Sequence, residues 1–98
     1  MRTFLYVDPR TLRLPPSRLD GADPAKLHRQ IDRYGQSVQG MPPLFVYRGS
    51  DGELMITDGV TRATHVAKLI SGVKVQVEVI GELPTPCGHL PTVGDRLP

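Results

Sequence analysis

The sequence predicts an α+β domain in which a small mixed β-sheet is packed by two main helices. The clearest observation is the alternation of valine with polar residues in 73–80, which is typical of a strand with one buried face. Two further segments, 24–34 and 60–70, carry apolar residues at helical spacing. A chain of 98 residues, of which 39% are hydrophobic and 5% aromatic, is expected to build one small core, mainly from aliphatic side chains.

The amino-terminal part is predicted to hold two short extended pieces. Residues 4–7 are apolar and prone to form a strand, and residues 11–14 alternate in polarity. Pro9 separates the two pieces, because it has no N–H group to donate and restricts the residue before it to extended conformations. Two prolines end the second piece, and residues 17–22 are predicted to form a loop that holds Arg18.

The first helix has well-defined ends. Asp23 followed by Pro24 is a strong helix start, because aspartate caps free N–H groups and proline fits the first helical position. Gly35 offers a left-handed stop. The apolar stripe between these ends is formed by Leu27, Ile31 and Tyr34. The sequence therefore predicts a helix over 24–34.

The second half of the chain alternates between strand and helix signals. Two apolar runs, 44–47 and 54–56, are predicted to form strands joined by a glycine-containing hairpin turn. Their nearly continuous apolar character favours a sheet that is covered on both faces. A second helix over 60–70 is expected to end at Ser71 and Gly72 and to lead into the valine-rich strand.

The chain is expected to divide into a domain over 1–82 and a Pro/Gly-rich C-terminal tail over 83–98. The tail has no apolar periodicity, which predicts a poorly ordered or extended segment. Cys87, in the tail, is the only cysteine, so an intrachain disulfide and a zinc site of the Cys₄ or Cys₂His₂ type within one chain are excluded. We expect it to be an incidental, exposed thiol.

Charge is distributed unevenly along the chain. Residues 1–34 carry seven basic and four acidic side chains, whereas residues 35–98 carry five and six. This basic excess is weaker than a dense nucleic-acid patch, and a solvated surface explains it best. The apolar run at the amino terminus is too short for a signal peptide, and no run approaches the roughly 20 apolar residues of a membrane span. We therefore expect a cytoplasmic protein without membrane association.

The most informative stretch for function is Asp58-Gly59-Val60-Thr61-Arg62, where a predicted strand turns into a helix. The first N–H groups of a helix have no partner within it, and with the helix dipole they favour an anion such as phosphate. Glycine lets a ligand approach the backbone, threonine adds a hydroxyl, and arginine offers a planar fork of donors that suits phosphate. The simpler alternative is an ordinary helix start, with Asp58 as N-cap and Arg62 in solvent.

Two other residues are candidates for additional ligand contacts. Arg18 lies in the amino-terminal loop, and His65 lies one helical turn after Thr61, away from the predicted apolar stripe. No group of residues with the spacing of a resident metal site was found, so any metal ion would arrive with the ligand.

The ordered series of these elements resembles the ParB/sulfiredoxin-like superfamily over roughly residues 5–80. In that superfamily an early arginine, a helix of the Asp-Pro-x-x-Leu type, a Pro-x-x-Val strand, a Gly-Glu-Arg-Arg-x-x-Ala helix start and a Val-Pro-Val-x-Val strand follow one another. Here these places are held by Arg18, by Asp23 to Gly35, by Pro43 to Val46, by Gly59 to Ala63 and by Val73 to Ile80. The resemblance implies the superfamily fold and a phosphate pocket in which Gly59 and Arg62 contact the phosphates.

One departure from the superfamily bears on chemistry. Val60 stands where sulfiredoxin-like enzymes carry their catalytic cysteine and where partition-type members carry a glutamate. The resemblance therefore argues against redox repair and leaves Asp58 as the nearest carboxylate for catalysis or for Mg²⁺.

Three functions of different classes remain open. The first is a domain that binds a nucleotide or another phosphate ligand through Gly59, Thr61 and Arg62, with weak CTP or ATP hydrolysis assisted by Asp58 and Mg²⁺. The second is a metal-dependent nuclease or DNA-binding accessory that uses Asp58 and the amino-terminal arginines. The third is a non-catalytic protein-interaction module, such as an antitoxin-like or mobile-element partner. The sequence does not decide the oligomeric state.

Overall fold

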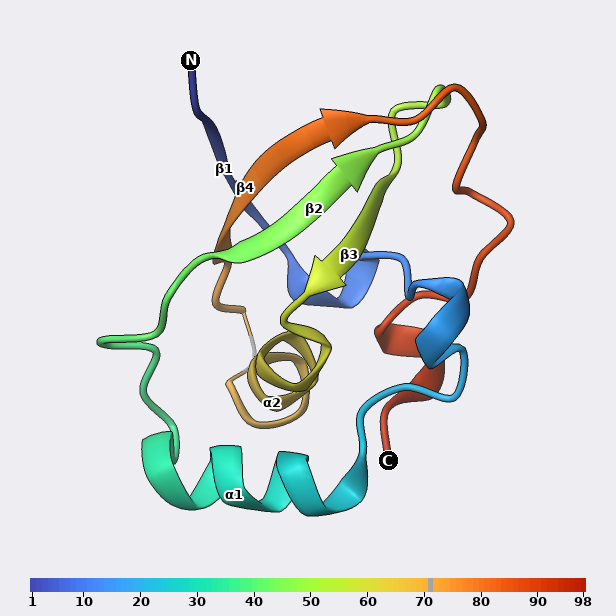
Figure 1. Ribbon diagram of the computed structural model, residues 1–98. Coiled ribbons are helices and arrows are strands. Elements are labelled where there is room, and N and C mark those ends of the chain that lie inside the picture. The colour runs from blue at the N-terminus through green and yellow to red at the C-terminus, as the bar shows by residue number, and fades with distance from the viewer. Residues whose placement is uncertain (71) are drawn as a thin grey trace.

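The computed structural model describes residues 1–70 and 72–98 and has the predicted α+β architecture (Figure 1). Four strands form one mixed sheet in the order β1-β4-β2-β3. Both helices lie on the same side of this sheet, with α2 between the sheet and α1 (Figure 1). The elements are β1 (Thr3–Val7), α1 (Pro24–Tyr34), β2 (Leu44–Arg48), β3 (Leu54–Asp58), α2 (Val60–Leu69) and β4 (Val75–Glu82).

The valine-rich strand β4 lies inside the sheet and organises it. It pairs antiparallel with β1 and parallel with β2, and Val77 is the partner of Leu5 on one side and Leu44 on the other. Val75 and Val77 are buried in the core, as their alternation predicted. Val73, included in the predicted strand, lies before it and packs against the core from outside.

Helix α1 begins and ends at the predicted residues. The Asp23 carboxylate accepts a hydrogen bond from the N–H of Lys26 at 3.2 Å, and Pro24 is the first helical residue. At the other end Gly35 has a positive φ of 58°, and its N–H donates to the carbonyl of Ile31. The cap and the glycine stop therefore both form, in agreement with the sequence.

Helix α2 covers the inner face of the sheet. Ala63, Val66 and Ala67 are buried against the strands and form its contribution to the core. The described part of the helix ends at Leu69. Ser71, which was expected to help end the helix, lies outside the described residues.

The opposite face of the sheet is open, which corrects the expectation of a sheet covered on both faces (Figure 1). Although β2 and β3 read as nearly continuous apolar runs, only alternate residues such as Val46 and Ile56 are fully buried. The residues between them are aromatic, methionine or threonine side chains, and their apolar character had suggested a second covering layer.

Residues 11–14 do not form the second extended piece that was expected. Pro9–Thr11 form a 3₁₀ turn instead, and Arg13 alone makes a single bridge to Met55 and another to Thr92. Leu12 and Leu14, on either side of Arg13, are fully buried. The alternation of this segment therefore reflects real burial, but its partners are an edge strand and the C-terminal segment. Within the loop expected after it, Pro16–Arg18 form a second 3₁₀ turn.

The C-terminal segment 83–98 packs on the domain, and the prediction of a poorly ordered tail is wrong. Val93 is 1% exposed and belongs to the core, and Leu97 packs against it. The backbone joins the core as well, because the N–H of Leu14 donates to Pro91 and the N–H of Val93 donates to Leu12. Irregular backbone places these apolar residues without any helical or strand period, so no periodicity marked them.

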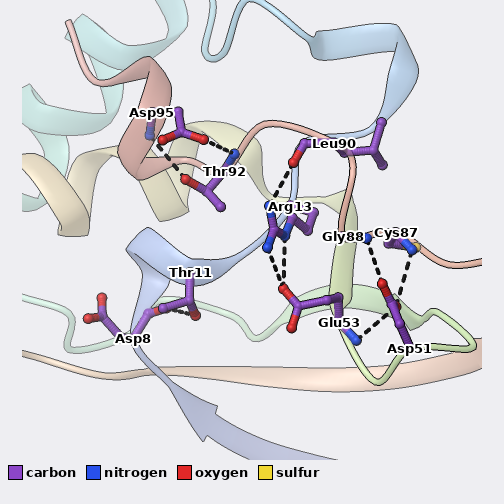
Figure 2. A network of polar contacts seen from close by, with 10 residues as sticks. All are labelled: Asp8, Thr11, Arg13, Asp51, Glu53, Cys87, Gly88, Leu90, Thr92 and Asp95. Atoms are coloured by element: carbon purple, nitrogen blue, oxygen red, sulfur yellow. Dashed lines mark hydrogen bonds and ion pairs between the residues drawn. The ribbon is translucent and has the colours of Figure 1, made fainter.

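A polar network fixes the start of this segment (Figure 2). The Asp51 carboxylate accepts hydrogen bonds from the backbone N–H groups of Glu53, Cys87 and Gly88, at 3.2, 3.2 and 2.8 Å. Burial works against the charged carboxylate, but these bonds outweigh it and lower the pKa of Asp51. Arg13 joins the network by donating to the Glu53 carboxylate at 2.7 and 2.9 Å and to the Leu90 carbonyl at 2.8 Å.

Cys87 is 2% exposed, which corrects the expectation of an exposed thiol. Burial raises the pKa of the Cys87 thiol, and the neighbouring Asp51 charge raises it further. The thiol is therefore a small packed side chain under the Asp51 loop.

We predict that Val77→Asp unfolds the domain. The substitution places a carboxylate in a fully buried site between two strands, at a cost of several kcal/mol out of a total stability of about 5–15 kcal/mol. Gln76→Asp is the matched control, because Gln76 points to the open face. Thermal unfolding followed by circular dichroism distinguishes the two. A cooperatively folded Val77→Asp protein would contradict the assigned core.

We also predict that the C-terminal segment is required for stability. Val93→Ala should cost about 2 kcal/mol through lost burial and a cavity, which corresponds to a fall in Tm of about 10 °C. Deletion of residues 83–98 should be more severe, because it uncovers Leu12 and Leu14. A deletion protein that melts within a few degrees of the intact chain would show that the segment contributes nothing to the core.

Candidate functional site

A cleft of about 650 Å³ lies between the start of α2, the helix α1 and the loop that precedes α1. It brings together five of the six residues that the sequence singled out. These are Arg18, Asp58, Gly59, Thr61 and Arg62. The sixth, His65, is not among the residues that line the cleft.

The junction of β3 and α2 is built on Gly59. Its φ is 114°, in the left-handed region that side chains rarely adopt. A Cβ atom at this position would lie 2.8 Å from Cγ of Leu44 and 3.1 Å from Nη2 of Arg62. Glycine is therefore required by the backbone and by packing against β2, whereas the sequence had suggested room for a ligand.

The amino terminus of α2 carries no side-chain cap. Asp58 was the expected cap under the simpler interpretation, but its carboxylate lies 3.5 Å from Nη2 of Arg62 instead. The first turn, formed by Val60, Thr61 and Arg62, lines the cleft. Its N–H groups keep the capacity to bind an anion, and the helix dipole adds to it.

Arg62 is held in place and is not a freely solvated side chain. It is 20% exposed, and its Nη2 donates to the carbonyl of Pro43 at 3.3 Å. Its Nε atom is buried and has no hydrogen-bond partner among residues 1–70 and 72–98. An unpaired buried guanidinium N–H is costly, and because this Nε has no accessible surface, a ligand in the cleft meets the other part of the Arg62 side chain, which is 20% exposed.

Helix α1 adds a row of basic side chains that the sequence interpretation had assigned to ordinary solvated surface. Lys26, Arg29 and Arg33 line the cleft opposite the start of α2. Their spacing of three and four residues places them on one face of the helix, and this was the signal that could have revealed them. With Arg18 and Arg62 they make five basic side chains against two carboxylates, those of Asp23 and Asp58.

His65 has a structural role. It is fully buried, which corrects its expected position away from the apolar stripe. Its Nε2 atom lies within hydrogen-bond distance of the Gly35 carbonyl, and because a carbonyl can only accept, Nε2–H is the donor. This bond ties α2 to the end of α1. His65 therefore links the two walls of the cleft from a buried position outside the cleft lining.

The cleft contains no ready-made metal site. Among residues 1–70 and 72–98, no group of three or more His, Cys, Asp or Glu side chains could hold a metal ion. Asp58, 65% exposed, offers one carboxylate. A single carboxylate suits Mg²⁺ only when phosphate oxygens of a ligand supply further bonds.

Comparison with known proteins does not assign the chain. No protein-family model matches it, and a search of the curated proteins finds no match. In the described part of the chain, no helix has the length and apolar character needed to cross a membrane.

The packing around Gly59 gives a prediction for stability. Gly59→Ala should cost about 2–4 kcal/mol, because it combines left-handed strain with a clash against Leu44. Gly52→Ala is the matched control, since Gly52 has a φ of 84° but nothing within 4 Å of an added Cβ, and it should cost only about 1–2 kcal/mol. Denaturant unfolding of both variants measures the difference. Equal losses would mean that the contact with Leu44 relaxes without cost.

Proposed function

We propose that the cleft binds a phosphate-bearing ligand, and that a nucleotide is the favoured class. The observation that carries this proposal is the meeting of an uncapped helix start with five basic side chains in one cleft. Phosphate is the common biological ligand that uses both backbone N–H groups and arginine forks.

The two walls of the cleft are proposed to do different work. The first turn of α2 and Arg62 form a fixed site, because the guanidinium of Arg62 is held by the Pro43 carbonyl and lies 3.5 Å from the Asp58 carboxylate. Lys26, Arg29 and Arg33 are exposed, so they attract the ligand and adapt to it. A ligand with more than one phosphate group reaches both walls, which favours a nucleoside di- or triphosphate or pyrophosphate over a single phosphate.

The proposal includes the resemblance to the ParB/sulfiredoxin-like superfamily, because that resemblance implies the same class of ligand. We propose Asp58 as the residue that would hold Mg²⁺ beside the ligand phosphates, with the ion supplying charge neutralisation there. CTP or ATP hydrolysis would need a base for water, and Asp58 and Asp23 are the carboxylates that line the cleft. The nuclease and interaction-module hypotheses predict different results in the experiment below.

The central test is the affinity of the Arg62 variants for CTP, ATP, GTP and pyrophosphate, each with and without Mg²⁺, measured by calorimetry. Arg62→Ala should weaken binding about 10- to 150-fold, the loss expected for a charged hydrogen bond of about 1.5–3 kcal/mol. Arg62→Lys should recover part of the affinity, since it keeps the charge but loses the planar fork. Arg48→Ala removes the same charge at the far end of β2 and should leave the affinity unchanged.

The basic side chains of α1 provide a second, independent test of the same proposal. Arg29→Ala alters an exposed side chain and should leave Tm unchanged, while weakening binding about 1.5- to 5-fold and reducing its dependence on salt. Absence of binding by the wild-type protein at millimolar ligand would refute the proposal and favour the interaction module. Metal-dependent plasmid cleavage, or a DNA shift abolished by Arg62→Ala without nucleotide binding, would favour the nuclease or DNA-binding function.

A further inference from the structure

The loop over residues 17–22, which we call the Arg18 loop, forms part of the cleft wall before α1. It supplies Arg18, the one basic side chain of the cleft that belongs to neither α1 nor α2. Its own backbone bonds are short-range: the N–H of Arg18 donates to the Pro15 carbonyl at 2.8 Å, and the N–H of Gly21 donates to the Arg18 carbonyl at 2.9 Å. Such local bonds shape the loop but do not attach it to the rest of the domain.

A hydrogen bond from the C-terminal segment attaches the Arg18 loop to the domain. Nε of Arg96 donates to the Leu19 carbonyl at 3.1 Å. Within the residues that the structure describes, which leave out residue 71, this is the only hydrogen bond between the loop and a part of the chain distant in sequence. The C-terminal turn and the loop lie side by side (Figure 1). The position of this part of the cleft wall therefore depends on a residue near the end of the chain.

Gly21 packs against the same arginine. It is buried, and its φ of 94° lies in the left-handed region that favours glycine. A Cβ atom added at Gly21 would lie 3.2 Å from both the Cβ atom and the carbonyl oxygen of Arg96. The loop and the C-terminal turn are therefore in close contact through their backbones as well as through the arginine side chain.

The turn that carries Arg96 is itself held firmly. The N–H of Thr92 donates to the Asp95 carboxylate at 3.0 Å, and the N–H of Asp95 donates to Oγ1 of Thr92 at 3.1 Å (Figure 2). These bonds lower the pKa of Asp95, so its carboxylate stays charged at neutral pH. Val93 and Leu97 anchor the turn in the core on either side. Arg96 is exposed and does not line the cleft, so it acts on the loop from outside.

We propose that Arg96 is a positioning residue for the cleft, which holds the Arg18 loop in the conformation that presents Arg18 to the phosphates of the ligand. This inference rests on the proposed function, because it concerns how tightly the same ligand is bound. Arg96 acts through the Leu19 carbonyl and through its contact with Gly21. Without these contacts the loop spends part of its time in other conformations, and the affinity falls in proportion to the fraction that remains competent to bind.

Calorimetric titration with pyrophosphate and with CTP, each with Mg²⁺, tests this role. Arg96→Ala should weaken binding about 3- to 10-fold, which corresponds to a competent loop population of about a third to a tenth. Arg96→Lys should recover most of the affinity, because its ammonium group can donate to the same carbonyl. Arg48→Ala removes the same charge at the far end of β2 and should leave binding unchanged. Circular dichroism melting should show that the Arg96 variants are folded, since this side chain is exposed.

A double-mutant cycle separates positioning from a general loss of stability or charge. In an Arg18→Ala protein, Arg96→Ala should weaken binding by less than about twofold, because the side chain through which it acts is absent. Gly21→Ala should reproduce the effect of Arg96→Ala, because the added Cβ displaces the loop from the C-terminal turn. Gly40→Ala is its matched control: Gly40 has a φ of 81° but nothing within 4 Å of an added Cβ, and binding should not change.

Amide hydrogen exchange of the ligand-free proteins, followed by NMR, measures the loop directly. The amides of Arg18 and Gly21 should exchange faster in Arg96→Ala than in the wild type, while those of α1 stay unchanged. The positioning role is overturned, and the proposed function stands, if the wild type binds either probe and folded Arg96→Ala matches it in affinity or in loop exchange. The same holds if Arg96→Ala loses as much affinity without Arg18 as with it. A wild-type protein that binds neither probe refutes the proposed function and the positioning role together.

Discussion

Gly59 stands where β3 turns directly into α2, and the position tolerates no side chain for two independent reasons. Its φ of 114° belongs to the left-handed region, and an added Cβ would meet Leu44 on the neighbouring strand. The close contact brings the start of α2 down beside β2, where Pro43 can hold Arg62. This turn fixes where α2 starts beside β2, and the bond between His65 and the Gly35 carbonyl then ties α1 to α2. The shape of the cleft therefore depends on backbone packing at Gly59, and the charged side chains line a shape that this packing has already set.

Local signals predicted those parts of the fold that depend on neighbouring residues. The Asp23-Pro24 start, the Gly35 stop and the valine alternation of β4 form as expected, because capping and strand periodicity need little tertiary context. The C-terminal segment could not be read in this way. Val93 is buried by contacts with residues about eighty positions earlier in the chain, and an irregular backbone leaves no period to detect.

The candidate site was predictable in one wall and not in the other. The strand–Gly–helix pattern pointed to Asp58, Gly59, Thr61 and Arg62, and all four line one cleft. The basic side chains on α1 were not recognised as part of the site, because a charged helix face usually points to solvent. Only the packing of α1 against α2 places them at the cleft. His65 was misplaced for a related reason, since the surface that buries it belongs to the end of α1.

The docking of residues 91–97 also has a consequence for the order of events during synthesis. Leu12 and Leu14 emerge from the ribosome early, but the backbone that covers them, Pro91 and Val93, emerges about eighty residues later. Likewise β1 waits for β4 before it has a partner. The growing chain completes the segments of α1 and of the β2–β3 hairpin early, yet Leu12 and Leu14 stay uncovered until residues 91–97 have emerged. Contacts of such long sequence separation slow folding, so the nascent chain is expected to be vulnerable to aggregation and to benefit from a chaperone.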